Sequence, residues 1–334
     1  MKLRSIICCA LLLALGVFTT VHAQESEYKI SKAFTHKNLS IFLIHGRDKY
    51  TKNNILTLQE AMENKEFVVY ETSDVNELAV ENLSKTQDVF IQSGDIVKGG
   101  KQDRVLAVSI IIPAGSGRIL IQAFCVESGR WQKRGKEEDG KFGSSSERIV
   151  TKELKLAANK SKSQQEVWSE VSKAQDKLSA NVGATVNSNT SATSLQLALE
   201  NKQVKANIDS YIDALDNIIE DKRDVIGYAF AINGKINSAD VYVSNSLFKK
   251  LWLRMLKAAA VEAVANLNEK VKFSTVKPGE VLAFLEGAAR AKASEQTVSK
   301  RSKVITREDE KNVLFEAVDS RSKLVIHRNY VTKH

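Results

Sequence analysis

The segment from Asp224 to Asn245 constrains the fold of this chain most strongly. It reads DVIGYAFAINGKINSADVYVSN, with two mainly apolar, β-rich runs on either side of Asn233-Gly234. Asn-Gly is favoured in the two-residue type I′ turn, because both central residues of that turn have positive φ. The sequence therefore predicts an antiparallel hairpin here. Ser244 or Asn245 is then placed to cap a following helix.

The rest of the C-terminal part predicts helices and strands around this hairpin. SLFKKLWLRMLKAAAVEAVANL has an apolar stripe at Leu247, Leu251 and Leu256, which is typical of a helix. Pro278 marks the start of a second helix in PGEVLAFLEGAARAKA, since proline suits the first helical position. VLFEAVDSRSKLVIHRNYV predicts a final hairpin. We therefore expect an α+β fold, with a C-terminal antiparallel sheet packed by helices.

The N-terminal half, from Tyr28 to Trp131, reads mainly as strands. NLSIFLIHG, EFVVYET and DVFIQSGDIV are β-rich runs, and ILTLQEAMEN predicts a short helix. RVLAVSIIIPAGSGRILIQAFCVE predicts a second hairpin, because Pro, Gly and Ser in PAGSG are turn residues. Both of its runs are apolar on both faces, as in strands at the middle of a sandwich. This half is therefore predicted to be β-rich and sandwich-like.

A polar segment separates the two halves. Residues 135–147, GKEEDGKFGSSSE, predict a flexible loop between a β-rich region at 24–134 and a helical and α+β region at 148–334. Two amphipathic helices are expected after it, in QQEVWSEVSKAQDKLS and KQVKANIDSYIDALDNIIE. The two regions either form separate domains or share one core.

The N-terminus predicts export. Lys2 and Arg4 precede a short apolar run, and Val21-His22-Ala23 is a small-x-small cleavage signal. The apolar run is shorter than the ~20 residues that a spanning helix needs. We expect residues 1–23 to be a signal peptide cleaved after Ala23, and the mature protein to be periplasmic or secreted without a transmembrane segment.

Cys125 is the one cysteine left after this cleavage, because Cys8 and Cys9 lie in the signal peptide. No intramolecular disulfide is then possible. Cys125 stands in the apolar run ILIQAFCV, which favours a buried filler over a reactive thiol. A nucleophile would need a nearby cation and access to solvent.

Composition and motifs argue against several function classes. The chain has 49 Lys and Arg against 40 Asp and Glu, spread along its length, so nucleic-acid binding is not favoured. His36, His45, His327 and His334 form no close pair, and CxxC and HExxH are missing, so no metal site is expected. Phosphate-loop and GxSxG motifs are also missing, and no cofactor is expected. The sequence does not indicate an oligomeric state.

The predicted second hairpin brings two charged segments together. GGKQDR precedes its first strand and ESGRW ends its second, and these ends meet in an antiparallel pair. Arginine forks bind carboxylates or phosphates, and an indole offers a stacking face, so an anionic small molecule is the expected ligand. The alternative is an internal ion pair, such as Arg104–Glu127, under a Trp131 lid. The candidate binding residues are Lys101, Gln102, Arg104, Glu127, Arg130 and Trp131.

This region also resembles a known family. VFIQSGDIVKGGKQDRVLAVSIIIPAGSGRILIQAFCVESGRW is similar to the core motif of the bacterial ARG and Rhodanese-Phosphatase-superfamily-associated Protein domain. VIGYAFAINGKINSADVYVSNSLFKKLW resembles its second block, and the resemblance runs from about Tyr28 to Tyr330. Asp95 stands where Glu is expected, and Asp103 stands where Asn is common. The matching motif residues are Gln102, Arg104, Cys125, Glu127, Arg130 and Trp131.

The resemblance implies an uncharacterised globular domain. The family name records neighbouring domains, including enzymes of phosphatase and ADP-ribosylglycohydrolase type, and states no reaction for the domain itself. We therefore expect an exported ligand-binding or accessory module. The alternative is a hydrolase of nucleotide-like or ADP-ribose-like substrates, with Glu127 as acid or base and arginines on phosphate. Whether the protein is an enzyme stays open between the two.

Overall fold

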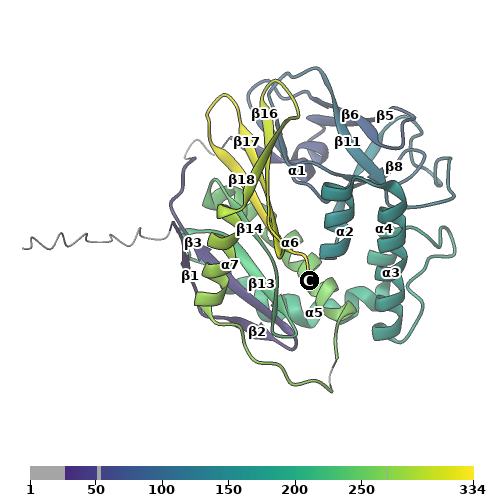
Figure 1. Ribbon diagram of the computed structural model, residues 1–334. Helices are drawn as coiled ribbons and strands as arrows, with labels where there is room; N and C mark the ends of the chain where they lie inside the picture. Colours follow the sequence, from purple (N-terminus) through teal and green to yellow (C-terminus); the bar gives the residue numbers. More distant parts are fainter. Residues whose placement is uncertain (1–26, 51–53, 269) are drawn as a thin grey trace, which may run out of the picture.

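The computed structural model describes residues 27–50, 54–268 and 270–334 (Figure 1). The predicted signal peptide, residues 1–23, lies outside the described residues. Strands gather in three sheets, and helices pack beside and between them. The fold is α+β, as the sequence predicts.

The largest sheet has nine antiparallel strands within the described residues. Their order is β1-β3-β13-β14-β18-β17-β16-β15, and β2 pairs with β3. The predicted hairpin is confirmed at the sheet's centre, with φ of 51° at Asn233 and 71° at Gly234. The predicted final hairpin is confirmed as β17–β18. The bounds are β1 (Lys29–Ile30), β2 (Phe34–His36), β3 (Leu39–His45), β13 (Val225–Ile232), β14 (Lys235–Tyr242), β15 (Lys292–Thr297), β16 (Ser302–Glu308), β17 (Asn312–Asp319) and β18 (Val325–Thr332).

Two predicted helices pack on this sheet. Helix α6 (Asn245–Ala265) begins after Ser244, whose hydroxyl accepts from the Leu247 N–H at 3.2 Å, so the predicted cap is confirmed. Helix α7 (Pro278–Arg290) has Pro278 in its first turn, also as predicted. The side chains of α6 join a core cluster with Tyr228 and Phe230 of β13. Those of α7 join a different cluster, with alternate residues of the same strands, so the sheet is covered on both faces.

Two smaller sheets form the rest of the β structure. A six-stranded sheet has the order β12-β8-β9-β11-β6-β5, and a three-stranded sheet has the order β10-β7-β4. Together they enclose their own apolar cluster, in keeping with the predicted sandwich-like character. The bounds are β4 (Ile55–Thr57), β5 (Phe67–Glu71), β6 (Glu77–Asn82), β7 (Asp88–Ile91), β8 (Asp95–Gly99), β9 (Arg104–Leu106), β10 (Ile110–Ile112), β11 (Arg118–Cys125) and β12 (Phe142–Arg148).

The predicted hairpin around PAGSG is correct at its base and wrong at its tip. Arg104 of β9 pairs with Cys125 of β11, as expected. The strand then breaks over residues 107–109, and β10 pairs with β7 instead of β11. Local turn residues could not predict this, because an apolar run can be buried equally well in another sheet.

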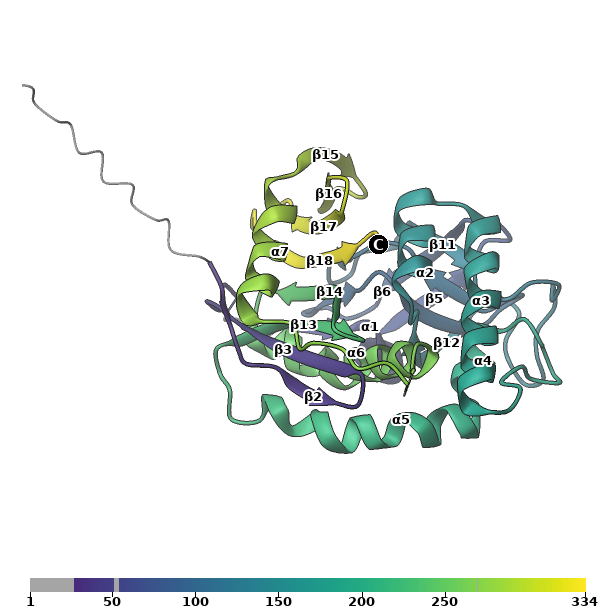
Figure 2. The same cartoon turned by 60° about the horizontal axis from the view of Figure 1, so that its bottom comes forward.

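The remaining helices lie between the sheets and along one side of the molecule. Helix α5 runs along the bottom of Figure 2 and packs against α6. The apolar stripes predicted for α3 and α5 are buried, apart from the half-buried Ile218 beyond the end of α5. The bounds are α1 (Leu58–Glu63), α2 (Lys152–Leu156), the π-helical segment η1 (Ala157–Ser161), α3 (Gln164–Val182), α4 (Leu195–Leu199), α5 (Lys202–Leu215) and the 3₁₀ segment η2 (Asp216–Ile219).

Three other predictions differ from the structure. The predicted loop at 135–147 contains most of strand β12, which pairs with β8 and buries Phe142. The predicted helix in ILTLQEAMEN starts as strand β4, and α1 follows the Thr57 cap. Strands β1 to β3 join β13 in the large sheet instead of the β-rich region. One apolar cluster holds side chains from both sides of the predicted boundary, for example Phe124 and Tyr242.

Candidate functional site

The corner formed by the KQDR and ESGRW segments assembles as the sequence predicts. The pairing of Arg104 with Cys125 puts the two segments side by side. Arg104 is fully buried, and its Nη1 donates to the Val75 carbonyl at 2.7 Å. Its Nη2 lies 3.3 Å from Glu71 Oε1. The acidic partner of Arg104 is therefore Glu71, and the expected Arg104–Glu127 pair does not form.

Glu127 is held by a different arginine. Arg130 Nη2 lies 2.8 Å from Glu127 Oε2, and the buried Gln102 side chain donates to the Glu127 carbonyl at 2.9 Å. Burial by itself raises the pKa of Glu127, but hydrogen bonds from Arg130, Ser191 and the Asp103 N–H outweigh burial and lower it. Glu127 is fully buried as a charged carboxylate that already has its cation.

Asp103 closes the same network. Arg134 Nη1 donates to Asp103 Oδ2 at 3.0 Å, and Arg134 Nη2 donates to Asp103 Oδ1 at 3.1 Å. Ser194 Oγ donates to Asp103 Oδ2 at 3.0 Å. Burial raises the pKa of Asp103, and the neighbouring Glu127 charge adds to this effect against the pull of Arg134. The corner thus pairs its buried charges internally.

The side chains of Lys101 and Trp131, two of the six candidate residues, lie outside this network. Trp131 is 49% exposed, and Lys101 Nζ lies 5.2 Å from its ring centre, so Trp131 is not a lid over Arg104.

Burial raises the pKa of the Cys125 thiol to about 11, against the opposing charge of Arg104. Cys125 is thus a buried strand residue, which fits the filler role. Ligand binding by the six candidate residues stays a prediction.

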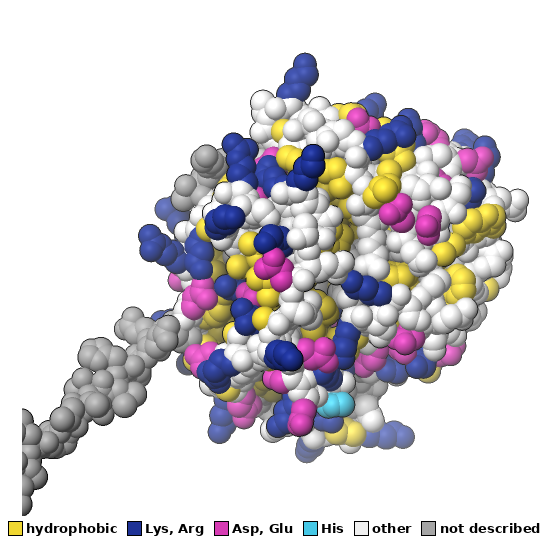
Figure 3. Space-filling view, turned by 45° about the horizontal axis from the view of Figure 1, so that its top comes forward, with side chains coloured by type: hydrophobic (Ala, Val, Ile, Leu, Met, Phe, Trp, Pro, Cys, Tyr) yellow, Lys and Arg dark blue, Asp and Glu magenta, His cyan; other side chains and the backbone are white. Residues whose placement is uncertain are grey.

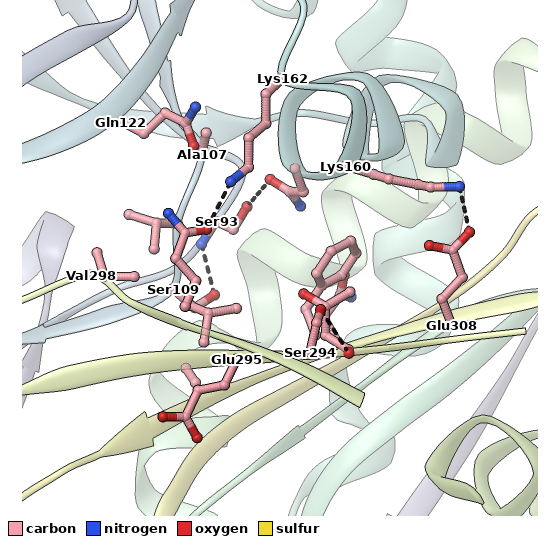
Figure 4. Close-up of a pocket in the computed structure, with 18 residues that line it drawn as sticks. Ser93, Ala107, Ser109, Gln122, Lys160, Lys162, Ser294, Glu295, Val298 and Glu308 are labelled. Carbon is pink, nitrogen blue, oxygen red and sulfur yellow. Dashed lines mark hydrogen bonds and ion pairs between the residues drawn. The ribbon is translucent and has the colours of Figure 1, made fainter. Parts of the chain in front are cut away.

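A second region, which the sequence did not reveal, surrounds a cavity of about 430 Å³. The cavity lies between the segment around η1 and the β15–β16 hairpin (Figure 4). Two side-chain bridges join its walls: Lys160 to Glu308 at 2.6 Å, and Lys162 to Gln296 at 2.9 Å. The π-helical turn of η1 is a feature often found at functional sites.

Ser109 lies on the wall of this cavity, in the break between β9 and β10. Its Oγ lies 3.1 Å from His327 Nδ1, and His327 Nε2 lies 2.9 Å from Asp240 Oδ1. His327 and Asp240 come from the adjacent strands β18 and β14, and each side chain is 1% exposed. The three residues form a continuous Ser–His–Asp array that runs from the cavity into the protein interior.

The contact between Asp240 and His327 constrains where the protons of this array can lie. Burial alone raises the pKa of Asp240, but the hydrogen bond and charge of His327, with Lys155 and Arg148, lower it below the usual range. Asp240 is therefore a carboxylate, and His327 Nε2 must carry the proton between them. In the tautomer with its only ring proton on Nε2, His327 has Nδ1 as an acceptor for the Ser109 hydroxyl.

Neighbouring groups orient the array. The His327 ring stacks on Tyr242, with centres 4.8 Å apart, and meets the edge of Phe90. Asn329 Nδ2 donates to Asp240 Oδ1 at 2.9 Å. Gly227 lets β13 approach β14 closely here, because a Cβ at that position would lie 2.3 Å from the Asp240 carbonyl oxygen.

A tight turn supplies a further contact to Ser109. In the sequence QSGD, the Asp95 carboxylate accepts from the Gln92 N–H, and Gly94 has a φ of 94°. This turn directs the Ser93 N–H to Ser109 Oγ, at 3.0 Å. The Ser93 hydroxyl donates instead to Asn159 Oδ1 at 2.5 Å. Ser109 Oγ thus accepts a hydrogen bond from the Ser93 N–H, and its own hydroxyl proton is available for the contact with His327 Nδ1.

Charged side chains are buried beneath the array. Burial of an ion costs several kcal/mol unless partners compensate, and such clusters concentrate at functional sites. Here some atoms, including Asp240 Oδ2 and Glu262 Oε2, have no hydrogen bond within the described residues. Burial also lowers the pKa of Lys155. The buried charged residues of this cluster include Asp95, Arg148, Lys155, Asp240, Arg254 and Glu262.

The structure also bears on metals, membranes and surface charge. Across 27–50, 54–268 and 270–334, no three His, Cys, Asp or Glu side chains are grouped to hold a metal ion. None of the helices in these ranges combines the length and apolar character of a membrane span. Lys and Arg are scattered among Asp and Glu on the face in Figure 3.

The sequence missed the array for a simple reason. Ser109 and His327 are 218 positions apart, and His327 and Asp240 are 87 apart, so no local spacing connects them. The available signals were weak: Asp240 and His327 stand in strands with several other polar residues, and QSGD belongs to the motif quoted above.

Fold and site together define an α+β protein in which a Ser–His–Asp array meets a cavity of mixed polar and apolar lining beside a large antiparallel sheet. The model of the ARG and Rhodanese-Phosphatase-superfamily-associated Protein domain matches residues 27–331. The chain belongs to this family, as its motifs suggested. Comparison with curated proteins and with solved structures gave no significant match.

Proposed function

We propose that this protein binds a small polar ligand in the cavity between η1 and the β15–β16 hairpin. The observation that carries the proposal is the cavity itself, whose volume of about 430 Å³ falls in the range of small-molecule sites. Its wall mixes hydroxyls, amides and charged groups with apolar side chains, among them Ser93, Gln122 and Asn329 beside Val304 and Phe315. Such a lining orients a ligand by a few polar contacts.

The ligand is proposed to carry an anionic group. Lys162 donates across the cavity to the neutral side chain of Gln296. An anion in the place of that amide would form a stronger, charge-assisted hydrogen bond. The Lys160–Glu308 bridge is partly exposed, with side-chain exposures of 40% and 37%, so it contributes little to stability and can open readily.

A binding experiment with a matched pair of variants tests this proposal. Thr306 of β16 lines the cavity, whereas Ile305, its neighbour on the strand, does not. Nucleotides, sugar phosphates and small carboxylates are screened for thermal stabilisation, and calorimetry measures the strongest ligand. Thr306→Trp is expected to abolish its binding by filling the cavity, and Ile305→Trp is expected to preserve it. Binding that survives Thr306→Trp would place the ligand elsewhere.

Export is proposed together with this function. It is supported by the basic n-region, the short apolar run and the Val21-His22-Ala23 signal. N-terminal sequencing of the protein from fractionated bacterial cells should find Gln24 first, in the periplasm or medium. A protein that starts at Met1 in the cytoplasm contradicts this proposal.

A further inference from the structure

We infer that Ser109 is a nucleophile that accepts the acyl group of a small carboxylic ester, with His327 as its general base and Asp240 as the residue that orients His327. This inference deepens the proposed function, because it rests on the same cavity. The corner residues take no part in it. The ester is expected to carry an anionic group that pairs with Lys162 at the cavity's edge.

The geometry meets the requirements of an activated serine. A general base must lie within about 2.6–3.2 Å of the proton that it takes, and His327 Nδ1 lies 3.1 Å from Ser109 Oγ. The base must in turn be oriented by a third group, and Asp240 does so at 2.9 Å. Ser109 is half-buried and lines the cavity, whereas its two partners are shielded from water.

The array uses the two imidazole nitrogens in the reverse sense from the serine protease triad. There, Nε2 faces the serine and Nδ1 faces the aspartate. Here Nδ1 faces Ser109 and Nε2 faces Asp240. Both nitrogens can be the basic one in neutral histidine, and the hydrogen bond to the other decides which. The Asp240 contact therefore makes Nδ1 the base.

The first step transfers the acyl group to the protein. Ser109 Oγ forms a bond to the ester carbonyl carbon as its proton moves to His327 Nδ1. The tetrahedral intermediate then breaks its bond to the alcohol oxygen, which leaves with the proton from His327. In the second step, water gives a proton to His327 and attacks the acyl carbon. The Ser109 oxygen leaves and recovers that proton, so the products are an acid and an alcohol.

Donors near Ser109 can stabilise the negative oxygen of the intermediate. The Ser93 N–H already lies 3.0 Å from Ser109 Oγ, and the amide side chains of Asn159 and Gln122 line the same cavity. Fixed donors of this kind supply a large part of the rate enhancement in acyl transfer. The QSGD turn is thus assigned a role in holding one donor in place.

A solely structural role for the buried pair explains less of the geometry. A His–Asp pair that ties β14 to β18 does not need a third residue at a cavity. Here the strand break at 107–109 places a hydroxyl between His327 and the open space. Strand irregularities of this kind are common next to active sites.

A fluorophosphonate probe tests the inference in the full-length protein. The probe forms a bond from Ser109 Oγ to phosphorus and loses fluoride, while the serine proton passes to His327. Intact mass and peptide mapping are expected to find one adduct per chain, on Ser109. Ser109→Ala should show no adduct. Ser116→Ala is the control, because it removes a serine hydroxyl that bonds the Gly117 carbonyl at an exposed turn and does not line the cavity.

The outcomes separate this inference from the proposed function. An adduct on Ser109 that Ser116→Ala retains supports it, and hydrolysis of a p-nitrophenyl ester by the same sample should be lost in Ser109→Ala. An unmodified Ser109 in a protein whose ligand binding is abolished by Thr306→Trp overturns catalysis and leaves the binding site intact. Labelling on a different residue also overturns it. Circular dichroism of each variant checks that the fold is preserved.

Discussion

The corner and the cavity both contain buried charges, and they use them differently. In the corner, arginines and carboxylates meet one another: Arg104 with Glu71, Arg130 with Glu127 and Arg134 with Asp103. At the cavity, the Asp240–His327 pair continues to a hydroxyl on an open wall. A dense charged motif such as the corner can therefore be a set of internal ion pairs. A reactive site also needs one of its hydrogen-bonded side chains to reach a cavity that a ligand can enter.

The largest expected effect is on the array. Asp240→Asn is predicted to lower the rate of fluorophosphonate labelling by roughly 10⁴-fold, the size of the loss in kcat that this change causes in a serine protease. An amide N–H facing His327 Nε2 would force the proton onto Nδ1, which then no longer accepts from Ser109.

Asp224→Asn is the matched control for this change. Asp224 pairs with His45 at 2.9 Å, at an exposed position that does not line the cavity. Labelling of Ser109 should be unchanged in this variant. Equal rates for the two variants would show that the Asp240 contact does not activate Ser109.

The next largest effect is on stability at the corner. Arg104→Met is predicted to lower the free energy of unfolding by about 3–5 kcal/mol, because it leaves the buried Glu71 carboxylate without its cation. Urea denaturation measures the change. Arg118→Met is the control, since the Arg118–Glu81 pair is 3.9 Å apart and its arginine is 64% exposed. That change should cost below about 1 kcal/mol. A similar loss of unfolding free energy in the two variants would contradict the claim that the ion pairs of the corner stabilise the fold.

A thiol comparison separates the two regions directly. Ser109→Cys is predicted to react with iodoacetamide within minutes at pH 8, because His327 can take the thiol proton. Cys125 in the wild-type protein should stay unlabelled until urea unfolds the chain, since its pKa is raised to about 11 by burial. Fast labelling of folded wild-type protein would contradict the assignment of Cys125 as a filler.

The same shift gives a pH dependence of stability. The thiol pKa rises from about 9 in the unfolded chain to about 11 in the folded protein. The folded state therefore holds this proton more tightly, and the resulting stability is present below pH 9 and lost as the pH rises towards 11. Cys125→Ala should flatten the stability curve in this window, measured by urea denaturation.

The smallest effect is expected at the cavity's edge. Lys162→Met should weaken selection of an anionic over a neutral ester by a few-fold, because its exposed ammonium is screened by solvent and salt. Lys303→Met is the control, as Lys303 pairs with Glu295 and does not line the cavity. The ratio of kcat/KM values for the two esters measures the effect. An unchanged ratio would remove Lys162 from ligand recognition.

Local signals predicted much of the fold. Asn233-Gly234 gave the central hairpin, and Ser244 and Pro278 marked the starts of α6 and α7. Each of these features depends on a few neighbouring residues, so a single sequence is sufficient. The corner was also predictable in outline, because Arg104 and Cys125 belong to one antiparallel pair.

Contacts between residues that are distant in the sequence could not be predicted from the sequence alone. Strand β10 pairs with β7 instead of β11, which follows it in the sequence. The Gly- and Ser-rich strand β12 pairs with β8 and forms one edge of its sheet. Glu71, the partner of Arg104, comes from a different strand of the same sheet. Asp240 and His327 meet through the pairing of β14 with β18, and Ser109 reaches them from the break between β9 and β10, so nothing in their local sequence records these contacts.

The structure of the protein after reaction with the fluorophosphonate probe tests the central claim most directly. The account predicts phosphonate density bonded to Ser109 Oγ inside the cavity, with His327 and Asp240 in contact as before and the corner ion pairs unchanged. Density on another residue, or an unmodified Ser109 after prolonged exposure, would contradict the assignment of Ser109 as a nucleophile.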